Sequence, residues 1–446
     1  MEKTLTQDTD SKAWYLSNFD FFESKLNGSA TLPFHKKRRT AISKFTELGF
    51  PTTRNEEWKY TNVAALASNK FKLATEAAPL APSAIAEFLF GELEQNLLVF
   101  VNGRFASKLS RVRAKNKNLV IENLASVLQR GNETSARHLA QYAAYDKEAF
   151  IALNTAFAHD GAFIHVPDNV VVEEPIHLLY LSTGEAGAFA AHPRNLILLG
   201  KNSHARLIES YHGLNEGAYF NNIVSEIVLE ENARLEHVRI QSESRQAYHI
   251  AAREVKQGKH SVYTSISVDL GGTLVRNNFN VRLAAENCEG NLYGFYMAGG
   301  TQLIDNHTLI DHLMPHCQSN EHYKGILADK AQGVFNGKVM VHQDAQKTNA
   351  YQSNQCLLLS DEANINSKPQ LEIFADDVKC SHGATIGQLD DEQLFYLRAR
   401  GISLNEANAM LRYAFASEIL QRINMPQVAE KIEEMVHACF RQETRA

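Results

Sequence analysis

The chain has 446 residues, of which 44% are hydrophobic and 22% are charged, and its formal net charge is -6. This length provides for large cores and two or three domains, whereas the slightly negative charge argues against nucleic-acid binding driven by overall charge. No apolar run approaches the roughly 18 residues of a membrane helix, and residues 1–7 lack the apolar segment of a secretion signal.

The first 150 residues have a mostly helical pattern. One helix is predicted to cover residues 40–48 and to end at Gly49, because glycine readily takes the left-handed conformation after a helix. An alanine-rich stretch predicts a second helix over residues 135–153. Between them, the apolar residues 97–101 and the following Asn102-Gly103 predict a strand and a turn.

From about residue 160 to residue 385, apolar and polar residues alternate over short runs, which predicts strands with one buried face. The triplet Ala205-Arg206-Leu207 recurs at residues 233–235, and no strict repeat extends beyond it. Successive strands without helices between them argue against a doubly wound α/β fold and leave a sandwich, a barrel or a β-helix open. Turns are predicted at three pairs: Gly271-Gly272, Gly299-Gly300 and Asn336-Gly337.

The last 55 or so residues return to a helical pattern. Asp390 is predicted to cap a helix that stops at Gly401, and Ser403 with Glu406 forms the capping box of a second helix. Pro426 is suited to the first turn of a third helix. These helices either cover an edge of the β core or bind a partner.

The common catalytic motifs are missing from the sequence. Its three Gly-Lys pairs lack the spacing of a phosphate loop, and no HExxH, GxSxG or GxGxxG motif occurs. The chain is therefore expected to lack a nucleotide-hydrolysing site of its own.

Four histidines raise the alternative of a metal-binding, cupin-like β protein. They lie within sixteen residues, around Cys317, and are His307, His312, His316 and His322. His307 and His312 are separated by an odd number of positions, so on one regular strand they would point to opposite faces. The five cysteines are widely spaced and odd in number, which favours a reducing cytoplasm over a disulfide framework.

The most informative region is Lys379-Cys380-Ser381-His382-Gly383. Cys380 and His382 are two positions apart, so on a strand both side chains would lie on one face. Thiolate and imidazole are suitable ligands for iron. The residues alone also allow a purely structural interpretation, in which His382 only makes hydrogen bonds and Cys380 is a small buried hydrophobic residue.

Together with this segment, five other stretches resemble the SufB/SufD family of iron–sulfur cluster assembly proteins, and its SufD branch in particular. They are residues 54–61, 153–157, 160–161, 354–373 and 394–401. Nearly the whole chain is covered, and the combination is highly specific. The SufD branch is indicated because Glu362-Ala363-Asn364 stands where SufB-like chains carry a cysteine turn, and Ser381-His382-Gly383 where they carry a Glu-His-Glu run.

The resemblance implies a mainly β fold with a right-handed parallel β-helix core, flanked by a helical N-terminal domain and a C-terminal helical segment. The expected divisions are residues 1–155, the β-helix over 156–388, and an ATPase-docking helical domain over 389–446. It also implies a non-catalytic scaffold subunit of the cytoplasmic SUF complex, which pairs with SufB through the core strands and binds the SufC ATPase. A homodimer is expected to be possible in isolation.

The family's site residues carry over at the following positions. His382, and with less support Cys380, would serve a transient iron–sulfur cluster formed at the interface with SufB. SufC would dock on the C-terminal helices, and the residues expected to bind it are Arg398, Arg400, Met410, Leu411 and Phe415.

Overall fold

The computed structural model describes residues 2–26, 30–74, 78–93, 96–113, 116, 118–184 and 188–443. Its helices are α1 (Glu2–Lys25), α2 (Pro33–Leu48), α3 (Ala64–Ser68), α4 (Leu124–Gln129), α5 (Glu133–His138), α6 (Ala149–Phe157), α7 (Asp391–Arg398), α8 (Leu404–Leu420) and α9 (Pro426–Glu443), with 3-10 turns η2 (Glu56–Trp58), η3 (Pro82–Phe88) and η4 (Gly91–Leu93).

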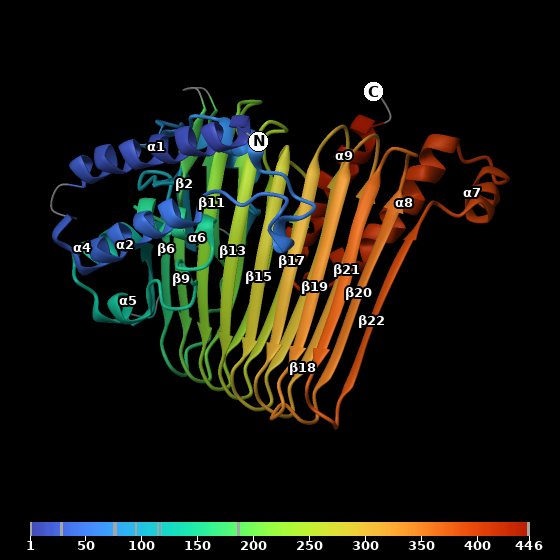
Figure 1. Ribbon diagram of the computed structural model, residues 1–446. Helices are drawn as coiled ribbons and strands as arrows, with labels where there is room; N and C mark the ends of the chain where they lie inside the picture. Colours follow the sequence, from blue (N-terminus) through green and yellow to red (C-terminus); the bar gives the residue numbers. More distant parts are fainter. Residues whose placement is uncertain are drawn as a thin grey trace.

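Between these two helical regions the chain winds into a parallel β-solenoid (Figure 1). Its strands are β1 (Lys72–Leu73), β2 (Asn96–Val101), β3 (Arg104–Phe105), β4 (Arg111–Val112), β5 (Val120–Asn123), β6 (Ala162–Val166), β7 (Ile176–Ser182), β8 (Phe189–Ala191), β9 (Arg194–Leu199), β10 (His204–Gly213), β11 (Tyr219–Leu229), β12 (Arg234–Ser242), β13 (Tyr248–Gln257), β14 (Val262–Asp269), β15 (Leu274–Leu283), β16 (Glu289–Ala298), β17 (Leu303–His312), β18 (Gln318–Leu327), β19 (Gln332–Val341), β20 (Asn349–Leu358), β21 (Asn364–Ile373) and β22 (Lys379–Gly387).

Two sheets form the walls of this solenoid. From β9 onward the odd-numbered strands pair in parallel in one wall, which we call the odd sheet, and the even-numbered strands pair in parallel in the other, the even sheet. Each winding of the chain therefore adds one strand to each sheet. The expected parallel β-helix with helices at both ends is confirmed.

A column of turn residues explains why the chain changes sheets at regular intervals. Asn202, Asn232 and Asn287 each precede an even strand by two positions and have φ near +55° to +60°. Asparagine tolerates this left-handed conformation better than most residues. The column also forms a hydrogen-bonded ladder, since the Asn232 side chain donates to that of Asn202 at 3.0 Å. These turn residues mark the structural repeat. The recurring triplet Ala-Arg-Leu does not, because Ala205 pairs in register with Leu235 and not with Ala233.

Two predicted elements were wrong. Asn336-Gly337 lies inside β19, not in a turn, because Gly337 faces a crowded interior where a Cβ atom would stand 2.4 Å from the Gln352 amide nitrogen. The helix predicted over residues 135–153 is two helices, α5 and α6, and Ala140 between them has a φ of 55°. The predicted caps at Gly49, Ser403 and Pro426 are confirmed.

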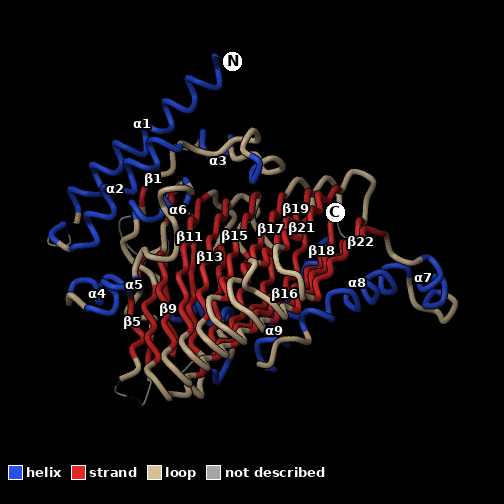
Figure 2. The backbone as a smooth tube through the Cα atoms, turned by 60° about the horizontal axis from the view of Figure 1, so that its bottom comes forward, coloured by secondary structure: helices blue, strands red, loops and turns tan. Residues whose placement is uncertain are grey.

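The N-terminal helices cover the outer face of the odd sheet (Figure 2). Aromatic side chains dominate their core, including Tyr15, Phe45 and Phe157, and Phe150 of α6 joins this core to Phe220 of the sheet, with ring centroids 6.1 Å apart. The predicted strand over residues 97–101 is confirmed as β2, which pairs in parallel with β7 and so extends the even sheet. The proposed division at residue 155 stays a prediction.

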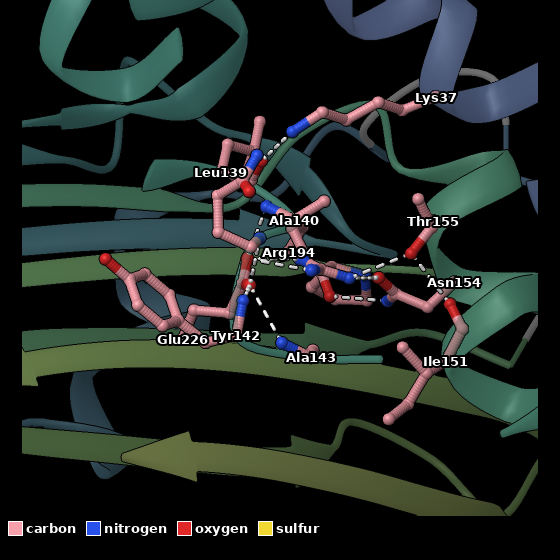
Figure 3. A network of polar contacts seen from close by, with 12 residues as sticks. Lys37, Leu139, Ala140, Tyr142, Ala143, Ile151, Asn154, Thr155, Arg194 and Glu226 are labelled. Atoms are coloured by element: carbon pink, nitrogen blue, oxygen red, sulfur yellow. Dashed lines mark hydrogen bonds and ion pairs between the residues drawn. The ribbon is translucent and has the colours of Figure 1, made fainter. Parts of the chain in front are cut away.

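A buried carboxylate fastens the α5–α6 connection to the odd sheet (Figure 3). Glu226 of β11 accepts the backbone N–H groups of residues 140, 141, 142 and 143 at 2.7, 2.9, 2.7 and 3.0 Å. Arg194 of β9, also fully buried, pairs with Glu226 at 2.7 Å and donates to Thr155 of α6 at 3.0 Å. The predicted long helix is interrupted because the Glu226 carboxylate accepts hydrogen bonds from four consecutive backbone N–H groups. In a continuous helix these groups would donate to carbonyls of the helix itself.

The C-terminal helices α8 and α9 cover the outer face of the even sheet rather than an edge. Ile419, Val436 and Phe440 pack there against Ile266 and Phe295. Among the residues that the structure describes, no helix is long and apolar enough to cross a membrane.

Candidate functional site

The strand that carries Cys380 and His382 is the last one of the even sheet. β22 pairs in parallel with β20 (Figure 1), and no other strand of the described ranges pairs with it. Most of its residues are exposed. The Lys379 N–H donates to the Thr348 carbonyl at 2.8 Å, so the alternating N–H groups of Cys380 and His382 point to the open side. β21, paired only with β19 in these ranges, ends the odd sheet in the same way.

The Cys380 side chain points between the two sheets. It is half-buried and packs in a small apolar cluster with Val339, Val341 and Ala350. Burial raises the pKa of the Cys380 thiol, and a hydrogen bond with Ala350 opposes this shift only in part. The thiol is therefore a poor ligand until it loses its proton.

His382 lies two positions further along the same strand, and hence on the same inner face as Cys380. Its side chain is exposed, because β22 ends the even sheet. An imidazole and a thiol thus share one face at an open strand edge. The roles of both residues stay predictions.

The four histidines of the alternative reading are distributed over different parts of the solenoid. His307 and His312 lie on β17 and point to opposite faces, as predicted: His312 is buried beside Ser319, and His307 contacts Glu57 outside the odd sheet. His316 lies in a turn, and His322 lies in the even sheet near Glu418. In the part of the chain that is described, no three His, Cys, Asp or Glu side chains gather in a way that could hold a metal ion.

The segment that contains η2 lies against β15 and β17, although it is some 220–250 positions away in sequence. Arg276 donates to the Glu57 carbonyl and to the Asp305 carboxylate, both at 2.7 Å, and its guanidinium lies 3.8 Å from the centre of the Trp58 ring. Burial opposes the charged form of His307, but Asp305 outweighs it, so the pKa of His307 is raised.

A cavity of about 220 Å³ opens beside this segment. Charged side chains line it: Glu57, Glu148, Glu254, Arg276, His307 and Lys338. Sequence reasoning singled out residues 54–61 only as part of the family resemblance and missed the charged cluster beside them. Period-two patterns show which residues share a strand face, but they do not show that residues 54–61 lie across that face.

Glu254 on β13, which lines this cavity, makes the stability of the folded chain depend on pH. Burial raises the pKa of its carboxyl from 4.5 to about 7, and the hydrogen bond from Asn280 opposes the rise only in part. Between these two values the folded chain holds a proton that the unfolded chain has lost, so stability falls as the pH rises from 4.5 to above 7.

We expect Glu254→Gln to remove this loss of stability. The variant should match the wild type near pH 4, below the ordinary pKa of the carboxyl, and exceed it at pH 8 by about 1–3 kcal/mol. Urea unfolding at both pH values measures the difference, and the exposed Glu174→Gln change is the control. An identical pH dependence in wild type and Glu254→Gln would contradict the assignment.

The residues predicted to dock an ATPase differ in accessibility. Arg398 and Arg400 are exposed at the end of α7, where the Arg400 guanidinium lies 3.3 Å from the centre of the Tyr396 ring. Met410 is exposed on α8, whereas Leu411 and Phe415 are half-buried. Phe415 faces the even sheet, since Lys324 lies 4.4 Å from its ring centre.

Two large apolar residues of this region were missed as candidates. Phe395 and Tyr396 on α7 are 75% and 57% exposed, and α7 extends beyond the end of the solenoid (Figure 1). None of the residues of α7 is buried. Adjacent aromatic residues on a short helix that follows the last strand were the available signal.

Comparison with known proteins identifies the family. The family model described as "SUF system FeS cluster assembly, SufBD core domain" matches residues 180–415, and the SufBD protein N-terminal region matches residues 9–178. A SufBD-family iron–sulfur cluster assembly protein of Synechocystis sp. is 36% identical over 422 residues, 93% of each chain. The iron–sulfur cluster assembly protein SufD of Escherichia coli is 33% identical over 387 residues, covering 86% of this chain and 87% of that protein. The chain therefore belongs to the SufBD family of iron–sulfur cluster assembly proteins.

Proposed function

We propose that this chain is a non-catalytic scaffold subunit of a cytoplasmic SUF complex. In this proposal it pairs with SufB, and iron and sulfide are assembled into a transient cluster at the interface between the two chains. The observation that carries the proposal is the open edge of β22, where Cys380 and His382 share one face of an exposed strand.

The edge supports pairing with a second chain for a general reason. An unpaired strand edge presents a row of free N–H and C=O groups, and another strand can complete the hydrogen bonds. β21 and β22 offer two such edges at one end of the solenoid. A homodimer could use the same edges, so that SufB and a second copy would compete for them.

An interface at this edge would also supply the missing ligands. Protein-bound iron–sulfur clusters generally need about four ligands, and Cys380 and His382 provide at most two. In our proposal SufB contributes the remainder, with His382 as the main ligand from this chain and Cys380 as the weaker one. The half-buried position of the Cys380 thiol, with its raised pKa, supports this order.

Anaerobic co-expression with the neighbouring SUF proteins tests the proposal. We expect a complex with SufB and SufC that carries iron and sulfide after purification. Purification of this chain without SufB under these conditions, with the two other proteins forming the cluster alone, would contradict it.

We further propose that the SufC ATPase docks on α7 and the adjoining face of α8. The exposed Phe395, Tyr396 and Met410 support this position, because exposed aromatic residues and methionine are enriched in protein interfaces. Deleting everything after residue 388 is a poor test, since α8 and α9 also cover apolar residues of the even sheet.

Point changes separate docking from folding. We expect Phe395→Asp combined with Met410→Asp to weaken SufC binding by at least about tenfold, in line with a loss of 1–2 kcal/mol at interface anchors, while SufB pairing is retained. Isothermal titration with purified SufC measures the loss, and Phe21→Asp, at an exposed aromatic of α1, is the matched control. Unchanged affinity in the double variant would place the docking site elsewhere.

A further inference from the structure

The inner face that carries His382 continues into the solenoid as a column of polar side chains. His382 pairs in register with Gln352 of β20, and Gln352 pairs in register with Glu321 of β18. Residues in register on parallel strands point to the same face and stand about 4.8 Å apart. Gln352 and Glu321 are fully buried, whereas His382 is exposed at the open end.

Of the two polar atoms in the Gln352 side-chain amide, one makes a hydrogen bond with a described group and the other does not. Its Nε2 donates to the Glu321 carboxylate at 2.5 Å. Its Oε1 is buried and accepts no hydrogen bond from any described group. A buried carbonyl oxygen without a donor is destabilising, and this one belongs to the residue in register with His382 on the adjacent strand.

The opposite sheet confines this amide. Gly337 of β19 faces Gln352, and a Cβ atom at Gly337 would stand 2.4 Å from Nε2. Glycine at this position leaves room for the Gln352 side chain to extend toward Glu321. Because an ionised carboxylate can only accept, Glu321 directs Nε2 toward itself and Oε1 away.

We propose that Gln352 is a positioning residue for His382: Oε1 of Gln352 accepts a hydrogen bond from one ring N–H of His382, which leaves the other ring nitrogen unprotonated to bind iron. This role rests on the proposed function of His382. A histidine that binds a metal usually donates its other N–H to an oxygen that fixes its tautomer and ring orientation. Glu321 serves the same purpose one strand further in, by holding the amide.

The state of His382 in the isolated full-length chain tests the proposal without any cluster. Nitrogen-15 NMR of the labelled histidine rings distinguishes the two tautomers, and the His382 signals are those that disappear in His382→Ala. The measurement is made at pH 8, because burial raises the pKa of Glu321 to about 7 and the carboxylate must be ionised.

In the wild type we expect one His382 tautomer to dominate, and in Gln352→Met we expect a mixture. Methionine is similar in length and unbranched, but it lacks the amide acceptor. Gln355→Met is the matched control, because Gln355 lies on the same strand at an odd spacing and so on the opposite face. Identical His382 signals in wild type and in folded Gln352→Met would overturn the proposal.

A second variant covers the case in which Gln352→Met does not fold. Gly337→Ala keeps the Gln352 amide but shifts it, because a Cβ atom there would stand 2.4 Å from Nε2, and the His382 signals should change in the same direction. In the complex with SufB, Gln352→Met should reduce cluster build-up about 10–100-fold. Normal cluster content in His382→Ala would refute the proposed function of His382, whereas the NMR comparison would still decide whether Gln352 orients it.

Discussion

His382→Ala is expected to reduce the iron and sulfide content of the SufB complex to below about a tenth of the wild-type level while the complex still assembles. The side chain is exposed on β22, so its removal should change the free energy of unfolding by no more than about 0.5 kcal/mol. In our proposal, however, the change removes an iron ligand, the imidazole on the same strand face as Cys380. Iron and sulfide assays on the anaerobically purified complex measure the result.

Neighbouring residues provide the controls for this variant. Ser381→Ala changes an exposed residue between the two candidates, on the opposite face of the same strand, and should leave the cluster content unchanged. Cys380→Ala should lower it less than His382→Ala does, because the raised pKa of the Cys380 thiol makes it the weaker ligand. Normal stoichiometry in His382→Ala, with the complex intact, would remove this residue from the site.

Glu226→Ala should destabilise the chain by about 3–5 kcal/mol, the cost of leaving a buried charge without its partner. Both Arg194 and Glu226 are fully buried, and four backbone N–H groups of residues 140–143 lose their acceptor at the same time. Urea unfolding measures the loss. Hydrogen exchange should show residues 140–143 opening first, because these N–H groups lose the Glu226 carboxylate as their acceptor.

Two further variants identify the cause of this loss. Glu231→Ala breaks an exposed pair with Lys201 and should cost under about 1 kcal/mol. Glu226→Leu with Arg194→Met replaces the buried pair by apolar groups and should restore part of the stability. A cost for Glu226→Ala no greater than that for Glu231→Ala would show that the network does not fasten the N-terminal helices.

Because of the Glu226 carboxylate, we also expect the chain to lose stability in acid. Burial alone would raise the pKa of Glu226, but Arg194 and the backbone N–H groups outweigh it, so the pKa lies below its ordinary 4.5. The stability that Glu226 supplies is therefore fully present above pH 4.5 and is lost as the pH falls through the lowered value. Glu254 acts in the opposite direction, at higher pH.

The sequence was sufficient to predict most helices and strands, but it did not predict which distant residues pack against them. The caps at Ser403 and Gly49 have local causes, so they are readable from a few residues. The break at Ala140 has its cause in Glu226, over 80 positions away, and could not be read locally. Asn336-Gly337 was mistaken for a turn because the demand for glycine there comes from Gln352 across the solenoid.

In the candidate site, too, features within one strand could be predicted and contacts between strands could not. Alternation within one strand was enough to place Cys380 and His382 on one face. It was not enough to place Gln352 and Glu321 behind His382, because the turns between strands differ in length and the register follows from them. The family resemblance implied a role for His382, which stays a prediction, but only the paired strands show which residues lie next to it.

The central claim is that the open edge of β22 is the surface that meets SufB, and hydrogen–deuterium exchange on that strand tests it most directly. The N–H groups of Cys380, His382, Ala384 and Ile386 alternate toward the open side. They should exchange fast in the isolated chain and become protected when SufB binds, while the amides of α1 stay unchanged. An assembled complex in which peptides from residues 379–387 exchange as fast as in the isolated chain would contradict the account.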